Sequence, residues 1–221
     1  MLLGVAISPW KRRMFAITGD DILQLKDAEL RTLVARLAVA ELAAQGAPCS
    51  AVTAGGHQDA KDGGIDVRVD LGNPLVAPDF VPRAMTVFQV KKPDMPRSEI
   101  IKEMRFGGIL RPAIAALADA GGAYIIVSAQ GSVADTPLAE RRQAMRDALA
   151  GHPTADDLLT DFYDRDRLAT WVNRYPGAAA WVRSRIGRPL SGWRPIGRWS
   201  NTAIARESGS RISDRACVIV E

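Results

Sequence analysis

The chain has 221 residues, 47% of them hydrophobic and 24% charged, which is the composition of a globular protein with a sizeable core. Its net charge of +4 permits contact with nucleic acid without requiring it. The two cysteines lie far apart and no apolar run could span a membrane. We therefore exclude a disulfide scaffold, a cysteine zinc site and a membrane protein, and expect a cytoplasmic protein.

The first strongly predicted element is a helix over residues 28–45. Asp27 caps its start and Gly46 ends it. An apolar stripe at helical spacing runs along it, formed by Leu30, Leu33, Val34 and Leu37. Glu41 falls on the same stripe, four residues after the last of these leucines. A carboxylate on a buried helix face needs a partner, so Glu41 is a candidate functional residue.

Two strands are predicted in the middle of the chain, near residues 65–71 and 85–91. A polar, glycine-rich segment over residues 50–64 precedes them and is expected to be a loop. The connection between the two strands suits an extended surface loop because it contains three prolines, Pro74, Pro78 and Pro82.

A helix is expected over residues 98–120, weakened by Gly107 and Gly108. Residues 123–128 form a short continuous apolar run, which indicates a buried central strand. Further helical segments are predicted at 137–149, 155–172 and 176–186. This alternation of helices and strands predicts a mixed α/β layer fold.

The composition changes towards the C-terminus, where four of the five tryptophans lie between Trp171 and Trp199 among several arginines. Such residues can stack on nucleic acid, but aromatics at helical spacing are more often core, and we expect Trp171 and Trp181 to be buried. The last residues resemble a strand, which favours a chain that continues into a further domain. We therefore expect one domain over residues 1–150 and a helical extension over 151–221 that links this domain to the further C-terminal one.

Three polar residues on the two predicted middle strands carry the chemical signal: Asp66, Gln89 and Lys91. Residues two apart in a strand face the same way, so Gln89 and Lys91 share one face while Phe88 and Val90 point into a core. A lysine beside an apolar strand needs an anionic neighbour, which Asp66 and a bound phosphate would supply. This arrangement is typical of metal-dependent phosphodiester hydrolysis.

That reaction needs an activated water, neutralisation of phosphate charge and help for the leaving oxygen. A magnesium ion, for which Mn²⁺ can substitute, supplies the first two and prefers oxygen ligands. Asp66 is the candidate primary ligand, Glu41 the candidate second carboxylate, and the carbonyl of Val90 a further oxygen. Gln89 would orient or ligate through its amide oxygen, and Lys91 would hold the attacking water or balance charge in the transition state.

Two short motifs resemble a known family. Residues 62–66 (Asp-Gly-Gly-Ile-Asp) and 88–92 (Phe-Gln-Val-Lys-Lys) are similar to the motifs of the PD-(D/E)XK nuclease superfamily, in its Mrr-like restriction endonuclease branch. The resemblance covers roughly residues 20–130. It implies a restriction-endonuclease-like α/β fold, in which helices flank a central mixed sheet of four to five strands. It also implies a glutamate from the preceding helix.

The helix glutamate can be assigned in more than one way. A residue-by-residue match of the helix start leads to Arg31, whereas the apolar stripe selects Glu41, with Glu29 as the reserve. Glu41 could equally be a carboxylate near the surface at the helix end. Two other residues are expected to have no role in the site. Lys92 should face away from it into solvent, and His57 should be a loop histidine.

The resemblance implies an Mg²⁺-dependent endodeoxyribonuclease that cuts double-stranded DNA, as an effector of restriction or bacterial anti-phage defence. Residues 164–200 loosely resemble segments that follow such nucleases in proteins with a fused NTPase sensor, which would lie beyond residue 221. We expect a homo-oligomer, because a nuclease of weak specificity needs an assembly switch. The alternative is a nucleic-acid-binding or assembly module without catalysis, and RNA or a DNA end stays open as the substrate.

Overall fold

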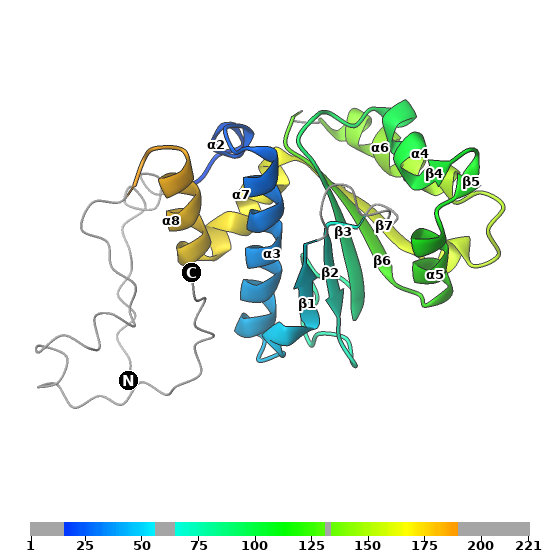
Figure 1. The fold of residues 1–221 in the computed structure, drawn as a ribbon, viewed down its shortest axis with the longest axis horizontal. Coiled ribbons are helices and arrows are strands. Elements are labelled where there is room, and N and C mark those ends of the chain that lie inside the picture. The colour runs from blue at the N-terminus through cyan, green and yellow to red at the C-terminus, as the bar shows by residue number, and fades with distance from the viewer. Residues whose placement is uncertain (1–15, 56–64, 131–133, 190–221) are drawn as a thin grey trace, which may run out of the picture.

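A computed structural model describes residues 16–55, 65–130 and 134–189, which form an α/β fold around a mixed five-stranded sheet (Figure 1). The first three strands in the sheet order are antiparallel neighbours, and the last three are parallel. In that order the strands are β1 (Val52–Ala54), β2 (Val67–Asp70), β3 (Met85–Lys91), β6 (Ala123–Ser128) and β7 (Leu159–Tyr163).

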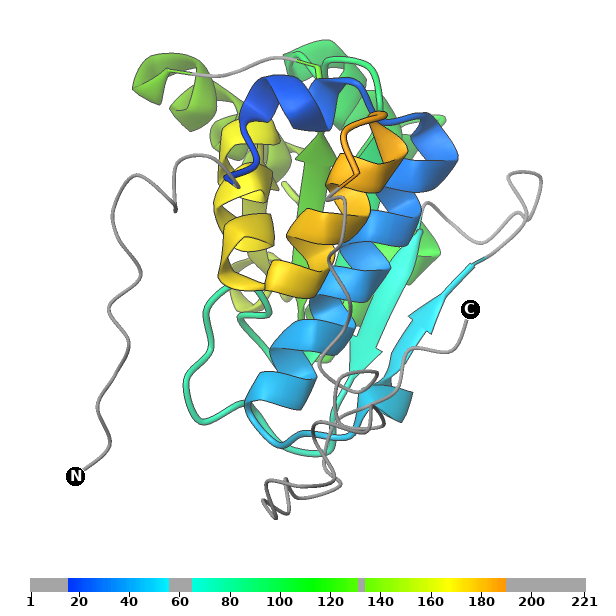
Figure 2. The ribbon, with the colours of Figure 1, turned by 90° about the vertical axis from the view of Figure 1, so that its left-hand side faces the viewer.

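Helices cover both faces of this sheet (Figures 1 and 2). The face towards the viewer in Figure 2 carries α2 (Gly19–Leu23), α3 (Asp27–Ala44), α7 (Arg165–Arg174) and α8 (Pro176–Arg185). The opposite face carries α4 (Arg97–Met104), α5 (Pro112–Asp119) and α6 (Asp135–Ala148). Short 3-10 turns lie at Cys49–Ala51 and Ala155–Asp157. No helix in the described parts of the chain is both long and apolar enough to cross a membrane.

Alternation along β3 sends neighbouring side chains into two different cores. Phe88 and Val90 belong to the core under α3, α7 and α8, whereas Val87 belongs to the core under α4, α5 and α6. Every residue of β6 is buried, so this strand is covered on both faces. The predicted buried central strand is therefore confirmed.

Aromatic packing joins α7 to the sheet. Trp171 is fully buried, stacks on Phe80 at a centroid distance of 5.1 Å and lies 5.7 Å from the ring of Phe88. Trp181 is half-buried between the guanidinium groups of Arg36 and Arg185. The prediction that Trp171 is a core residue is confirmed, and Trp181 packs against the edge of the same core.

The segment after residue 150 belongs to the same fold. Its strand β7 pairs in parallel with β6, and its helices α7 and α8 pack over α2 and α3. The predicted helix over 155–172 is wrong in its first half, because residues 159–163 form β7. Asp164 begins α7 only after that strand, where its side chain accepts a hydrogen bond of 2.8 Å from the Arg167 amide. A boundary at residue 150 would thus separate β7 from the sheet that it completes.

The predicted helix over 98–120 is interrupted by a hairpin. Helix α4 ends at Met104, and the strands β4 (Arg105–Phe106) and β5 (Ile109–Leu110) then form a two-stranded turn before α5 begins. Gly107 and Gly108 adopt φ angles of 59° and 80°, a left-handed backbone that favours glycine and ends a right-handed helix.

The close approach of α5 to β3 predicts an unequal response of two glycines to alanine. A Cβ on Gly122 would meet Leu117 and lie 2.9 Å from the carbonyl oxygen of Met85, whereas a Cβ on Gly177 in α8 meets nothing within 4 Å. We expect Gly122→Ala to lower the free energy of unfolding by about 1–3 kcal/mol. Gly177→Ala should leave it unchanged or raise it by up to about 1 kcal/mol, since alanine favours helix. Urea unfolding measures both, and equal values for the two variants would contradict this packing.

Candidate active site at the end of strand β3

Asp66 is bound to β3 through both its backbone and its side chain. Its amide donates to the carbonyl of Phe88 at 3.1 Å, and its carboxylate Oδ2 accepts from the Val90 amide at 2.7 Å. These two bonds lie on either side of Gln89 along the strand. The structure therefore brings Asp66 next to the segment that holds Gln89 and Lys91, as the two motifs predict.

A cation from α3 contacts the same carboxylate. Arg31 Nη1 lies 3.5 Å from Asp66 Oδ1, and the same guanidinium pairs with Asp27 one turn earlier in the helix. Both Arg31 and Asp66 are largely shielded, with side chains 23% and 16% exposed. The helix position that the residue-by-residue match selects thus carries an arginine at the site instead of an acid.

Lys91, which ends β3, and Lys92, which follows it, go to opposite sides of the sheet. The ammonium of Lys91 lies 2.9 Å from the Glu103 carboxylate of α4. Lys92 instead donates to the carbonyls of Leu23 and Leu25 after α2. Burial lowers the pKa of Lys92, although nearby Glu29 opposes this effect. Lys92 therefore faces away from Lys91 as expected, but it is half-buried and caps a loop where a solvated side chain was predicted.

Glu103 is a site residue that the sequence reasoning missed. Its side chain is 17% exposed and lies in the last turn of α4, whose neighbours Ile100 and Met104 are fully buried. A carboxylate beside a buried helical stripe was the available signal, the same one that selected Glu41 in α3. The pattern alone does not tell which of the two helices meets the lysine.

Gln89 is buried, with 4% of its surface exposed, and its amide oxygen has no hydrogen-bond partner among the described residues. The hydroxyl of Tyr124, fully buried on neighbouring β6, also lacks one. An unpaired buried polar atom costs about 1–3 kcal/mol. Two such atoms on adjacent strands leave room in the hydrogen-bonding of this region for an ordered water, an ion or a polar ligand.

The charges of the site act on the Tyr124 phenol. Burial raises the pKa of Tyr124, and the carboxylates of Glu103 and Asp66 raise it further, while Arg111 opposes them. The phenol therefore stays protonated and can donate a hydrogen bond but cannot serve as a base. Its response to both carboxylates indicates that Asp66 and Glu103 influence one common region beside β3.

Glu41 is buried elsewhere, with 2% of its surface exposed. It accepts hydrogen bonds from Trp171 Nε1 at 3.0 Å, the Tyr175 hydroxyl at 2.7 Å and Gln45 Nε2 at 3.3 Å. It follows Arg31 by ten residues of α3, which is about 15 Å along the helix axis. The structure does not bring Glu41 to Asp66, and the partner that this buried carboxylate needs is a pair of aromatic donors.

The remaining predicted site residues have more limited roles. Glu29, the reserve glutamate, accepts a 2.8 Å hydrogen bond from the Lys26 amide at the start of α3. No three His, Cys, Asp or Glu side chains gather in a metal-binding arrangement within the described residues. The other two predicted oxygen donors, the amide of Gln89 and the carbonyl of Val90, belong to the strand segment to which Asp66 is hydrogen-bonded. His57 and residues 62–64 lie outside the described residues.

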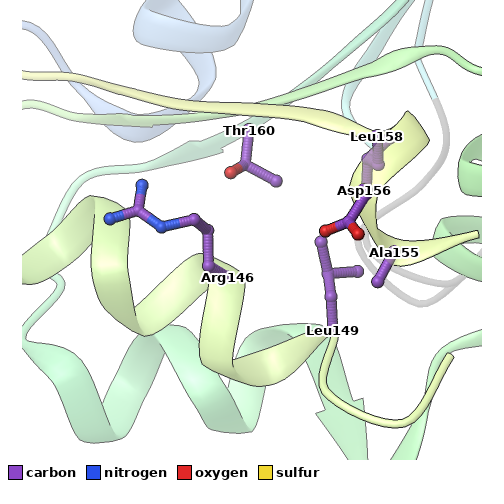
Figure 3. Close-up of a pocket in the computed structure, with 6 residues that line it drawn as sticks. All are labelled: Arg146, Leu149, Ala155, Asp156, Leu158 and Thr160. Atoms are coloured by element: carbon purple, nitrogen blue, oxygen red, sulfur yellow. The ribbon is translucent and has the colours of Figure 1, made fainter.

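A separate pocket of about 260 Å³ lies where α6 meets β7 (Figure 3). Thr160 and the guanidinium of Arg146 face each other there, with Asp156 on the far side. The Arg146 guanidinium is already held by the side chain of Gln143. Asp66, Gln89 and Lys91 do not line this pocket, so it is distinct from the candidate site.

The geometry predicts that Glu41 supports stability. Glu41→Ala leaves the buried indole N–H of Trp171 and the half-buried hydroxyl of Tyr175 without this acceptor, so we expect it to lower the free energy of unfolding by about 2–4 kcal/mol. Glu41→Gln keeps one acceptor oxygen and should cost less than Glu41→Ala. Urea unfolding followed by tryptophan fluorescence measures both. An unchanged stability with a loss of divalent-cation binding would instead assign Glu41 to the metal.

Comparisons with known proteins do not assign this chain to a family. No protein-family model, curated protein or solved structure matches the chain. The resemblance to Mrr-like nucleases stays a prediction, and the case for a function rests on the arrangement around Asp66.

Proposed function

We propose that this protein is a metal-dependent endonuclease of the Mrr-like PD-(D/E)XK type, which hydrolyses phosphodiester bonds of double-stranded DNA in restriction or anti-phage defence. One observation carries the proposal: the 2.7 Å hydrogen bond from the Val90 amide to Asp66. It holds a carboxylate beside Gln89 and Lys91, the combination that the motifs require. The mixed sheet with helices on both faces supports a restriction-endonuclease-like fold.

The residues present fit a hard divalent cation. Asp66, the unpaired amide oxygen of Gln89 and the carbonyl of Val90 are oxygen donors of the kind that Mg²⁺ and Mn²⁺ prefer. Such an ion, when bound, neutralises phosphate charge and lowers the pKa of a bound water. The second carboxylate near the lysine is Glu103, and we assign it the role that the sequence had given to Glu41.

Lys91 supplies the protein's own positive charge to the reaction. Its ammonium is 2.9 Å from Glu103, which orients it, and its side chain is 29% exposed. An approaching phosphate can therefore reach it without a rearrangement of the sheet. A preoriented cation at the place where negative charge develops stabilises the transition state more than a mobile one does.

A second candidate function has an observation in its favour. Arg31 contacts Asp66 at 3.5 Å and competes with any cation for that carboxylate. A chain that had lost catalysis but kept DNA binding or assembly could carry an arginine there. The two functions differ in whether substitution of Asp66 abolishes cleavage.

Cleavage of supercoiled plasmid with Mg²⁺ or Mn²⁺ tests the proposal. We expect Asp66→Ala and Lys91→Ala each to lower the rate by about 100-fold or more, since each removes a charge that acts on the transition state. Lys26→Ala removes an exposed lysine and should stay within about threefold of the wild type. Persistent cleavage by both site variants would refute the assignment. DNA binding without cleavage at any metal concentration would favour the module without catalysis.

Competition between Arg31 and a metal ion predicts a gain of affinity. Arg31→Met removes the cation beside Asp66, so Mn²⁺ should bind roughly tenfold more tightly. Asp66→Asn should abolish that binding. Isothermal titration calorimetry measures both without reference to activity. An unchanged Mn²⁺ affinity in Arg31→Met would show that the arginine does not compete for the ion.

A further inference from the structure

The β4–β5 hairpin presents an apolar pair to solvent. Phe106 and Ile109 lie directly opposite each other across its turn and are 77% and 75% exposed. Directly paired side chains on one face of a hairpin lie about 5 Å apart, so these two form a single apolar tip. Large apolar side chains that project together in this way mark an interaction surface.

This tip is held firmly in place. Arg105, at the base of the hairpin, donates to the carbonyls of Ala148 at 2.7 Å and Ala150 at 2.6 Å, at the end of α6. The same guanidinium donates to the Gly108 carbonyl within the turn at 2.9 Å. One side chain thus ties the turn to a neighbouring helix end, and the apolar pair projects from a fixed support.

The base of the hairpin is positively charged. Arg105 and Arg111 bind backbone carbonyls, and neither forms an ion pair with another described residue. The guanidinium of Arg111 lies 6.0 Å from the centre of the Phe106 ring. Lys102, one turn earlier, is 78% exposed, but it pairs with Glu99 and adds no net charge. An apolar tip flanked by two guanidinium groups that have no carboxylate partner among the described residues suits an anionic partner with apolar surfaces between its charges, which describes the stacked bases and phosphates of duplex DNA.

The hairpin is also linked to the candidate site. Arg111 donates to the backbone carbonyl of Glu103 at 2.5 Å, and the carboxylate of Glu103 contacts Lys91. Helix α4 therefore connects the end of β3 to the start of β4 (Figure 1). The helix that carries the partner of Lys91 thus leads directly into the hairpin.

We propose that Phe106 and Ile109 form a wedge that inserts between base pairs in the minor groove of duplex DNA, with Arg105 and Arg111 supplying positive charge for the flanking phosphates. The proposal rests on the proposed function, because it takes duplex DNA as the substrate. Apolar wedges of this kind unstack one base step and kink the duplex by roughly 20–90°.

Binding and bending of a doubly labelled duplex test the wedge in EDTA, where cleavage cannot occur. We expect the Phe106→Ser/Ile109→Ser double variant to bind the duplex about tenfold more weakly and to lose the bend measured by energy transfer. Val76→Ser is the matched control, because Val76 is 98% exposed in the loop between β2 and β3. It should bind and bend the duplex as the wild type does. Thermal melting verifies that both variants fold.

Three outcomes would overturn the wedge: a double variant that binds and bends DNA like the wild type, a wild type that binds no duplex, or a double variant that loses only self-association. The last would identify a second copy of the chain as the partner. Cleavage with Mg²⁺ is read separately on the wild type and on Asp66→Ala. If the double variant loses bending but the wild type cuts no DNA, the wedge is supported and the nuclease is rejected. If the double variant bends DNA normally and the wild type shows cleavage that depends on Asp66, the nuclease is supported and the wedge is rejected.

Discussion

The hydrogen bond between the Val90 amide and the Asp66 carboxylate is the constraint on which the candidate site depends. Asp66 lies just before β2, which begins at Val67. Its side chain therefore accepts a hydrogen bond from an amide of β3 near the end of the β2–β3 ladder. The carboxylate is thereby fixed relative to Gln89 and Lys91 by the pairing of the strands themselves. A group held by a regular element needs little reorganisation when a ligand arrives, which is the condition for electrostatic catalysis.

Alternation in β3 separates stability from chemistry. On the side of α3, α7 and α8, the strand packs Phe88 and Val90 against Trp171, and Glu41 fixes that tryptophan by accepting its indole N–H. On the side of α4, the same strand presents Lys91 to Glu103. A helix on each face thus supplies a shielded carboxylate to these contacts: Glu41 meets aromatic donors, and Glu103 meets an ammonium.

Local sequence patterns predict those structural features that are set by residues close together in the chain. The spacing of Gln89 and Lys91 and the apolar run of β6 follow from strand geometry, and both were predictable. The partners of Glu41 were not, since Trp171 lies 130 positions away and meets it only through tertiary packing. Strand β7 was missed because five residues between helical segments leave a weak period-two signal. Glu103 was missed because helix phase shows that a carboxylate faces inward but not which strand it faces.

Charge balance around Asp66 connects the resting site to the proposed reaction. Lys91 pairs with Glu103, and Arg31 is shared between Asp66 and Asp27. These ion pairs limit the cost of shielding the charges from water. Under the proposed function, Asp66 and Glu103 would hold a divalent ion, and Arg31 and Lys91 would contact the phosphate group of the substrate. Arg31, which opposes the binding of a metal ion alone, would then favour the binding of metal with substrate, because the phosphate would offer the guanidinium a second anion.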